Sequence, residues 1–166
     1  MSKAVLISIR PKWVEKIANG EKTIEVRKTK PKLETPFKCY IYCTLPKYPH
    51  EDFIATDYPM PQFYGGGKVI GEFTCDRIDK LVPTIEPYGI YDISDDYVLQ
   101  TCLANGALWD YGKGATLYGW HISDLKIYDR PRELREFRKP EFPTGLRLAD
   151  DEIKRPPQSW CYVEES

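Results

Sequence analysis

The sequence predicts an α+β fold, a small barrel of mostly antiparallel strands with two short helices and a long loop rich in proline and glycine. Short segments in which apolar and polar residues alternate recur along the chain, and only two segments show helical spacing. The 166 residues are 42% hydrophobic and 30% charged, as in globular domains. No repeat or domain boundary interrupts them, so we expect a single domain over residues 1–166.

The first strand and the first helix are expected next to each other. The segment "AVLISIRP" (residues 4–11) alternates like a strand, with its apolar valine and isoleucines on one face. Pro11 suits the first turn of a helix, and "PKWVEKIANG" (residues 11–20) has helical spacing up to a stop at Gly20. Trp13 lies on the apolar side of this helix and is expected in the core.

Two further strands precede the long loop. "KTIEVRK" (residues 22–28) places two apolar residues on one face and a threonine, a glutamate and an arginine on the other. "FKCYIYCT" (residues 37–44) alternates more clearly than any other segment. Residues 45–67 contain four prolines and end in three glycines, which predicts a long loop of the kind that often covers a binding site.

The second half of the chain supplies the remaining elements. Strands are expected in "KVIGEFTCDRI" (residues 68–78), "ATLYGWHISDLKIYD" (residues 115–129) and "SWCYVE" (residues 159–164). The second helix is expected in "DDYVLQTCLANG" (residues 95–106), with the preceding serine as its N-cap and Gly106 as its stop.

The formal net charge of −1 conceals an uneven distribution. Residues 1–50 hold eleven Lys/Arg against four Asp/Glu, a balance of +7. Residues 51–128 hold five against twelve (−7), and residues 129–166 hold eight against nine (−1), so the three balances sum to −1. The basic first third can form an anion-binding patch, unless the acidic second third folds against it and cancels its field.

Several classes of function are not indicated. No apolar run reaches the roughly 18–20 residues of a membrane span, and the N-terminal residues do not resemble a signal peptide, so we expect a cytoplasmic protein that does not enter a membrane. The five cysteines and two histidines show no zinc-ligand spacing, which predicts reduced, buried thiols and no metal. No glycine-rich dinucleotide or phosphate motif is present, so no cofactor is expected.

One charged motif stands out at the start of the second strand. The spacing Gly20-x-Lys22-x-x-Glu25-x-Arg27 resembles the G-x-K-x-x-E-x-R signature of the ASCH domain family, whose members have a PUA-like β-barrel. The context is similar too, because a strand ending in Arg-Pro and a short helix precede the motif. This resemblance implies a PUA-like core over about residues 4–140, with a C-terminal elaboration over about residues 141–166.

The resemblance also implies a role in RNA or nucleotide binding, in a cleft around the motif and beside the first helix. Some family members are thought to cleave RNA, so an alternative is a metal-independent ribonuclease or nucleoside hydrolase with Lys22 and Glu25 as catalytic residues. One branch removes the acetyl group from N4-acetylcytidine with a lysine and, three residues on, a threonine nucleophile. Glu25 occupies the threonine position here, which argues against that activity. A second alternative is a protein-interaction module that uses the C-terminal tail.

The chemistry of the motif residues permits either binding or catalysis. Glu25 and Arg27 lie two apart on one strand, so their side chains share a face and are about 6–7 Å apart along it. Lys22 can join them only from the turn after Gly20. The two cations can hold a phosphate, and the carboxylate can accept a hydrogen bond from a nucleobase. Alternatively, Glu25 can act as a general base if burial raises its pKa. An exposed Glu–Arg pair with no function is the simpler alternative.

Three other residues are candidate ligand contacts. Arg10 lies on the polar face of the first strand and is expected to approach the same cleft. Tyr118 and Trp120 share a face of the late strand and are candidates for stacking on an unpaired base. His121 lies on the opposite face, where a hydrogen-bonded structural role is expected. Nothing in the sequence specifies an oligomer, and a monomer is favoured.

Overall fold

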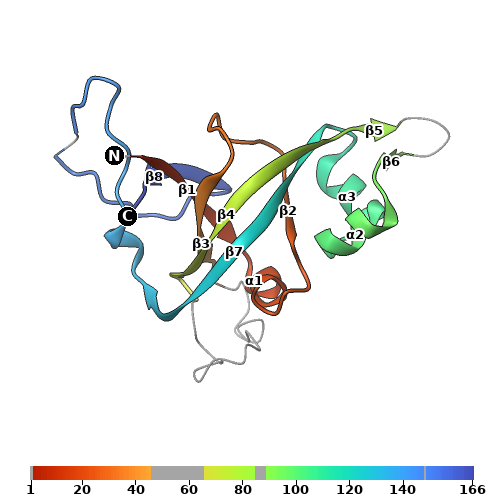
Figure 1. Ribbon diagram of the computed structural model, residues 1–166, viewed down its shortest axis with the longest axis horizontal. Coiled ribbons are helices and arrows are strands. Elements are labelled where there is room, and N and C mark those ends of the chain that lie inside the picture. The colour runs from red at the N-terminus through yellow and green to blue at the C-terminus, as the bar shows by residue number, and fades with distance from the viewer. Residues whose placement is uncertain (1, 46–65, 85–88, 148) are drawn as a thin grey trace.

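The computed structural model describes residues 2–45, 66–84, 89–147 and 149–166. Six strands form the central sheet: β1 (Lys3–Ile9), β2 (Ile24–Arg27), β3 (Phe37–Cys43), β4 (Lys68–Leu81), β7 (Leu117–Arg132) and β8 (Trp160–Glu164). They lie in the order β2-β7-β4-β3-β1-β8 (Figure 1). Only β1 and β3 pair in parallel, and every other neighbouring pair is antiparallel. The α+β class and the antiparallel character are as predicted.

Three α-helices, a short hairpin and a 3-10 turn (Leu134–Glu136) accompany the sheet in the described residues. Helix α1 (Pro11–Ala18) connects β1 to β2. The hairpin β5 (Pro83–Thr84) and β6 (Ile90–Tyr91) and the helices α2 (Asp95–Thr101) and α3 (Asn105–Gly112) all lie between β4 and β7 in the chain. Figure 1 shows this group at one end of the long β4–β7 pair, beside β2.

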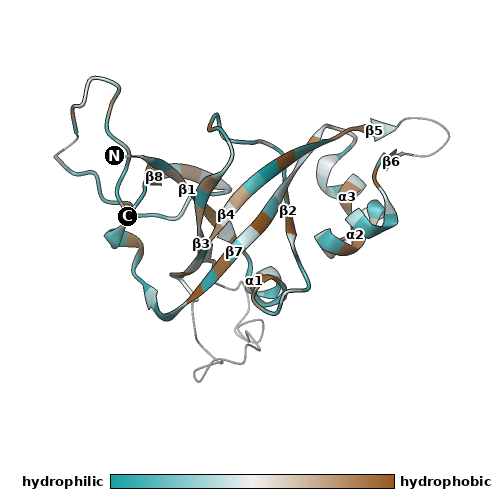
Figure 2. Ribbon diagram, in the orientation of Figure 1, coloured by the Kyte–Doolittle hydropathy of each residue, from teal (hydrophilic) through white to brown (hydrophobic). Residues whose placement is uncertain are grey.

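The sheet is buried on both faces around β1 and β3. Every residue of β1 after Lys3 is buried, as expected for a strand with neighbours on both sides and cover on both faces. Alternate residues of β1 belong to two different apolar clusters: Val5 and Ile7 pack on α1 and Trp120, and Ala4 and Leu6 pack on the C-terminal segment. Figure 2 shows apolar residues along the strands and mainly hydrophilic residues on α1's outer side and in the loops.

The prediction of a closed barrel needs correction, because the described strands form an open sheet. The edge strands are β2 and β8, and they share no backbone ladder. A side chain joins the two edges instead: Arg27 of β2 donates hydrogen bonds to the carbonyl oxygens of Ser8 in β1 and Ser159 before β8. The side chain of Arg27 therefore connects the β2 edge of the open sheet to β1 and to the segment before β8.

The second predicted helix is two helices. Ser94 caps α2 as predicted, since its Oγ accepts a hydrogen bond from the backbone N–H of Tyr97. The helix then ends at Thr101, because Cys102 adopts the left-handed conformation with φ of 58°. Helix α3 begins at Asn105, so Gly106 lies in its first turn and is not the predicted stop.

The predicted loop over residues 45–67 lies mostly outside the described structure, whereas the C-terminal segment is described. Most of the predicted loop over residues 45–67 lies outside the described residues, which include only positions 45, 66 and 67 of it. The C-terminal segment, expected as an elaboration, supplies β8, which pairs with β1 over five residues from Lys3↔Glu164 to Ile7↔Trp160. Among the described residues, no helix has both the length and the apolar character needed to span a membrane.

Two buried thiols in the core predict that the stability of the protein falls at alkaline pH. Cys39 and Cys75 are fully buried, and desolvation raises the pKa of both thiols, that of Cys75 to about 12 from an ordinary 9.0. Above pH 9 the unfolded chain loses these protons while the folded chain keeps them, so stability falls as pH rises. For Cys75 the loss between pH 9 and 11 is expected to be about 2–3 kcal/mol.

Urea unfolding at pH 8.5 to 11 checks this, because Cys75→Ala should flatten the decline of unfolding free energy with pH. Val69→Ala, in the same strand as Cys75, removes no ionisable group; it is the control and should leave the slope as in the wild type. Equal slopes for the wild type and Cys75→Ala would contradict the assignment of the alkaline sensitivity to this thiol.

Candidate functional site

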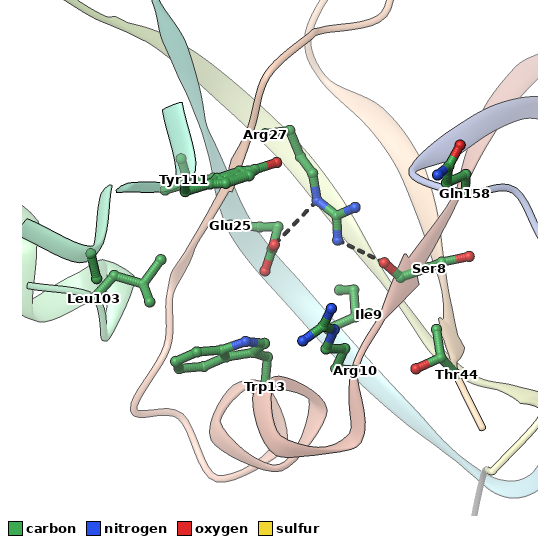
Figure 3. Close-up of a pocket in the computed structure, with 12 residues that line it drawn as sticks. Ser8, Ile9, Arg10, Trp13, Glu25, Arg27, Thr44, Leu103, Tyr111 and Gln158 are labelled. Atoms are coloured by element: carbon green, nitrogen blue, oxygen red, sulfur yellow. Dashed lines mark hydrogen bonds and ion pairs between the residues drawn. The ribbon is translucent and has the colours of Figure 1, made fainter. Parts of the chain in front are cut away.

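A cavity of about 460 Å³ opens between β1, α1, β2 and α3. The cavity is lined by Ser8, Ile9, Arg10, Trp13, Glu25, Val26, Arg27, Thr44, Leu103, Ala107, Tyr111 and Gln158. Figure 3 shows Trp13 and Tyr111 on opposite sides of Glu25, with Arg10 and Arg27 between these aromatic residues and β1. Its walls therefore combine two aromatic rings, one carboxylate and two guanidinium groups.

Strand β2 brings the charged motif to this cavity. Ile24 and Val26 belong to the apolar cluster that β2 shares with α2 and α3, and the alternation of a strand turns Glu25 and Arg27 to the other face. The turn before the strand uses Gly20, whose φ of 85° is in the left-handed region that glycine adopts without strain.

Arg27 is fixed by three groups. Its Nε donates to Glu25 Oε1 at 3.2 Å, one terminal nitrogen donates to the carbonyl oxygen of Ser8 at 2.7 Å, and the other donates to Ser159 O at 3.3 Å and Oγ at 3.2 Å. Four of the five guanidinium N–H groups thus have protein acceptors. Arg27 shapes the cavity wall and has little capacity left for a phosphate.

Glu25 is the buried acid of the cavity. Its Oε1 accepts the hydrogen bond from Arg27, and its Oε2 lies 3.8 Å from Lys22 Nζ, an ion-pair distance that is too long for a hydrogen bond. Oε2 is buried and has no hydrogen-bond partner among the described residues. Because an unpaired buried acceptor is costly, this oxygen is a candidate acceptor for a ligand's N–H or O–H group.

Lys22 supports Glu25 from behind the cavity. Its Nζ donates to the carbonyl oxygen of Thr101 at 2.5 Å and lies 5.2 Å from the centre of the Trp13 ring. Desolvation lowers the pKa of Lys22, and the negative charge of Glu25 opposes that shift. Lys22 is buried and does not line the cavity, so its charge acts on Glu25 and does not face the cavity.

Exposed cations surround the aromatic residues of the cavity. Arg10 is exposed and lines the cavity. Lys12 Nζ lies 4.6 Å from the centre of the Trp13 ring, and Lys28 Nζ lies 4.9 Å from that of Tyr111. Three exposed cations therefore lie in or next to the aromatic walls of the cavity, although the chain as a whole is nearly neutral.

The structure brings some of the predicted site residues together at the cavity. Lys22 and Arg27 both contact Glu25, and Arg10 lines the same cavity. The two predicted aromatic residues lie directly opposite the motif on β7, in the pairs Glu25↔Trp120 and Arg27↔Tyr118. Opposite residues of an antiparallel pair share a face, so the predicted groups do lie side by side.

Neither Tyr118 nor Trp120 lines the cavity, however. Trp120 is fully buried, and its ring packs edge-on against Phe37 and Trp160 with centroids 5.9 Å apart in each case. This placement corrects the expectation that Trp120 faces a ligand. Tyr118 is half-buried, with Lys30 Nζ 5.7 Å from the centre of its ring.

The sequence patterns identify neither aromatic residue of the cavity as a ligand contact. Trp13 was expected in the core, and the structure places it half-buried at the edge of α1, in the cavity wall. Tyr111 comes from α3, a helix that the sequence did not separate from α2.

The structural role predicted for His121 fits its contact with Asp79, where Nε2 and Oδ2 are 2.5 Å apart. In the part of the chain that the structure describes, no three His, Cys, Asp or Glu side chains could hold a metal ion.

Comparison with known proteins supports the fold. No protein-family model matches the chain, and no curated protein sequence matches it. Among solved structures, ASCH from Zymomonas mobilis superposes with a TM-score of 0.61 at 19% identity, over 98% of this chain and 88% of that one. Two variants of that protein, with a tyrosine changed to phenylalanine and a serine changed to alanine, give TM-scores of 0.59 and 0.62 at 18% and 19% identity. The alignments with these two variants cover 99% and 98% of this chain and 92% and 89% of the variant chains, respectively. The chain therefore has the fold of the ASCH domain proteins, as its G-x-K-x-x-E-x-R motif predicts.

Proposed function

We propose that this protein binds RNA or a nucleotide-like ligand, with one unpaired base in the cavity beside Glu25. The observation that carries the proposal is the buried carboxylate of Glu25, whose Oε2 lacks a hydrogen-bond partner among the described residues. A volume of about 460 Å³ is in the range of small-molecule sites. Trp13 and Tyr111 supply ring faces for a base, as is common when proteins bind single-stranded RNA.

The phosphate of such a ligand belongs at the rim and not at the motif. The guanidinium of Arg27 is engaged by Glu25, Ser8 and Ser159, and Lys22 is held behind the carboxylate by Thr101. The exposed cations Arg10, Lys12 and Lys28 remain available to an anion. This arrangement separates the base, which needs an acceptor, from the phosphate, which needs a positive charge.

A hydrolase that uses the same cavity is the second candidate. The observation in its favour is the buried Lys22–Glu25 pair, in which desolvation lowers the pKa of a lysine next to a carboxylate. Lys22 donates to Thr101 and does not line the cavity, so the pair is better placed to orient Glu25 than to transfer protons to a substrate. Incubation of labelled RNA with the protein and analysis for cleavage products tests this candidate directly.

The stacking part of the proposal predicts a large effect for Tyr111→Ala. A base that loses one aromatic partner should bind about 10–100-fold more weakly, since stacking is worth roughly 1–3 kcal/mol per base. Fluorescence anisotropy of a labelled ten-nucleotide single-stranded RNA measures the affinity. Tyr118→Ala is the matched control and should retain wild-type affinity, because Tyr118 does not line the cavity.

The two variants together decide where the ligand binds. Loss of affinity in Tyr118→Ala with no change in Tyr111→Ala would place the ligand beside Tyr118 and Lys30 and contradict the cavity. Circular dichroism and thermal melting of both variants separate a loss of binding from a loss of fold.

A further inference from the structure

Glu25 offers an unusual set of acceptors. An ionised carboxylate accepts hydrogen bonds and donates none, and each of its oxygens has two lone pairs. Oε1 uses one lone pair for Arg27, and Oε2 has no hydrogen-bond partner among the described residues. A ligand edge with two adjacent N–H donors would therefore fit this carboxylate better than an edge with one.

Only one of the four standard bases has such an edge. Guanine presents N1–H beside its exocyclic amino group, and these two donors lie in one plane with the spacing of a carboxylate. Adenine and cytosine present an amino group beside a ring nitrogen that carries a lone pair, and uracil presents one N–H between two carbonyl groups. In these three bases an acceptor would face the negative carboxylate, which is unfavourable.

The neighbouring charges argue for a neutral base. Lys12 and Lys22 already lie over the ring of Trp13, and Lys28 lies over that of Tyr111. A positively charged base, such as an alkylated purine, would be repelled by these ammonium groups although aromatic rings usually attract cations. Guanine keeps both donors in its neutral form.

We propose that the cavity selects guanine, through a two-fold hydrogen bond from N1–H and the 2-amino group to the carboxylate of Glu25. The inference rests on the proposed function, since it requires a base in the cavity. It assigns to Glu25 the role of a specificity-determining residue. Arg27 and Lys22 are positioning residues, because Arg27 donates a hydrogen bond to the carboxylate and Lys22 lies 3.8 Å from it.

Calorimetric titration of the protein with the four ribonucleoside 5′-monophosphates and with inosine 5′-monophosphate tests the selection. The guanine nucleotide should bind at least about tenfold more tightly than the other three standard nucleotides, the effect of one well-placed bidentate contact. Inosine keeps N1–H and the ring system but lacks the 2-amino group. Its nucleotide should bind about tenfold more weakly than the guanine nucleotide.

Glu25→Gln supplies the residue-level test, because an amide turns a donor toward one of the two guanine N–H groups. This variant should lose the preference, leaving the four standard nucleotides within about threefold of one another. Glu34→Gln removes a similar charge from an exposed position outside this cavity and should keep the full preference. If Glu25→Gln does not fold, the comparison of guanine and inosine nucleotides on the wild type still decides the question.

The outcomes separate this inference from the function on which it rests. Equal binding of the four nucleotides, with affinity lost in Tyr111→Ala, would overturn guanine selection and leave the base-binding cavity supported. A preference for guanine that survives in Glu25→Gln would also overturn the assigned contact. No binding of any nucleotide or of single-stranded RNA would overturn both.

Discussion

Arg27→Ala is expected to lower the free energy of unfolding by about 3–5 kcal/mol, the cost of removing one partner from a buried ion pair. The change removes four hydrogen bonds and leaves Glu25 buried with Lys22 3.8 Å away as its remaining cation. It also leaves the carbonyl oxygens of Ser8 and Ser159 without this donor at the junction of the two sheet edges. Urea unfolding at neutral pH measures the loss.

Arg10→Ala is the matched control, because Arg10 lines the same cavity but is exposed, and its loss should cost no more than about 0.5 kcal/mol. The double variant Glu25→Ala, Arg27→Ala removes both charges and should be less destabilised than the sum of the two single variants, by about 0.5–3 kcal/mol. A cost below about 1 kcal/mol for Arg27→Ala would show that the guanidinium does not hold the edges together.

Trp120→Ala is expected to cost about 3–5 kcal/mol, because the largest side chain of the core would leave a cavity. The ring contacts Phe37 and Trp160 and is fully buried. Its Nε1–H has no hydrogen-bond partner among the described residues, so part of the stability that the ring provides is offset by a buried donor. Thermal and urea unfolding measure the effect.

Trp120→Phe distinguishes packing from ligand contact. Phenylalanine keeps an aromatic ring and removes the unpaired donor, so the cost should be less than half that of the alanine variant. Affinity for single-stranded RNA should stay within about twofold of the wild type, since Trp120 does not line the cavity. A tenfold loss of affinity in a stable Trp120→Phe variant would restore the role that the sequence suggested for this residue.

Strand alternation, turn preferences and helix-capping preferences correctly predicted the features that depend on residues close together in the sequence. The alternation of β2 placed Glu25 and Arg27 on one face, and the turn after Gly20 brought Lys22 to them from α1's end. The cap at Ser94 was equally readable, because one side chain and one backbone N–H decide it. The first two of these predictions concern residues 20–27, and the third concerns two residues three positions apart.

The remaining features depend on contacts between distant segments. Alternation correctly grouped Tyr118 with Trp120, but it gives no sign that this face of β7 is covered by Phe37 and Trp160. The break between α2 and α3 depends on a left-handed Cys102, a conformation that cysteine seldom adopts and that propensity does not predict. The open sheet was missed for a similar reason, because barrel closure is decided by how the two edge strands meet.

The pairing of β8 with β1 has a consequence for the order of events during translation. The ribosome makes β1 first, but the strand that covers one of its edges follows more than 150 residues later. Until residues 157–164 emerge, Arg27 lacks Ser159 and the cavity lacks Gln158. A nascent chain therefore exposes an apolar strand edge, which is prone to non-native pairing, until residues 157–164 have been made and the cavity is complete.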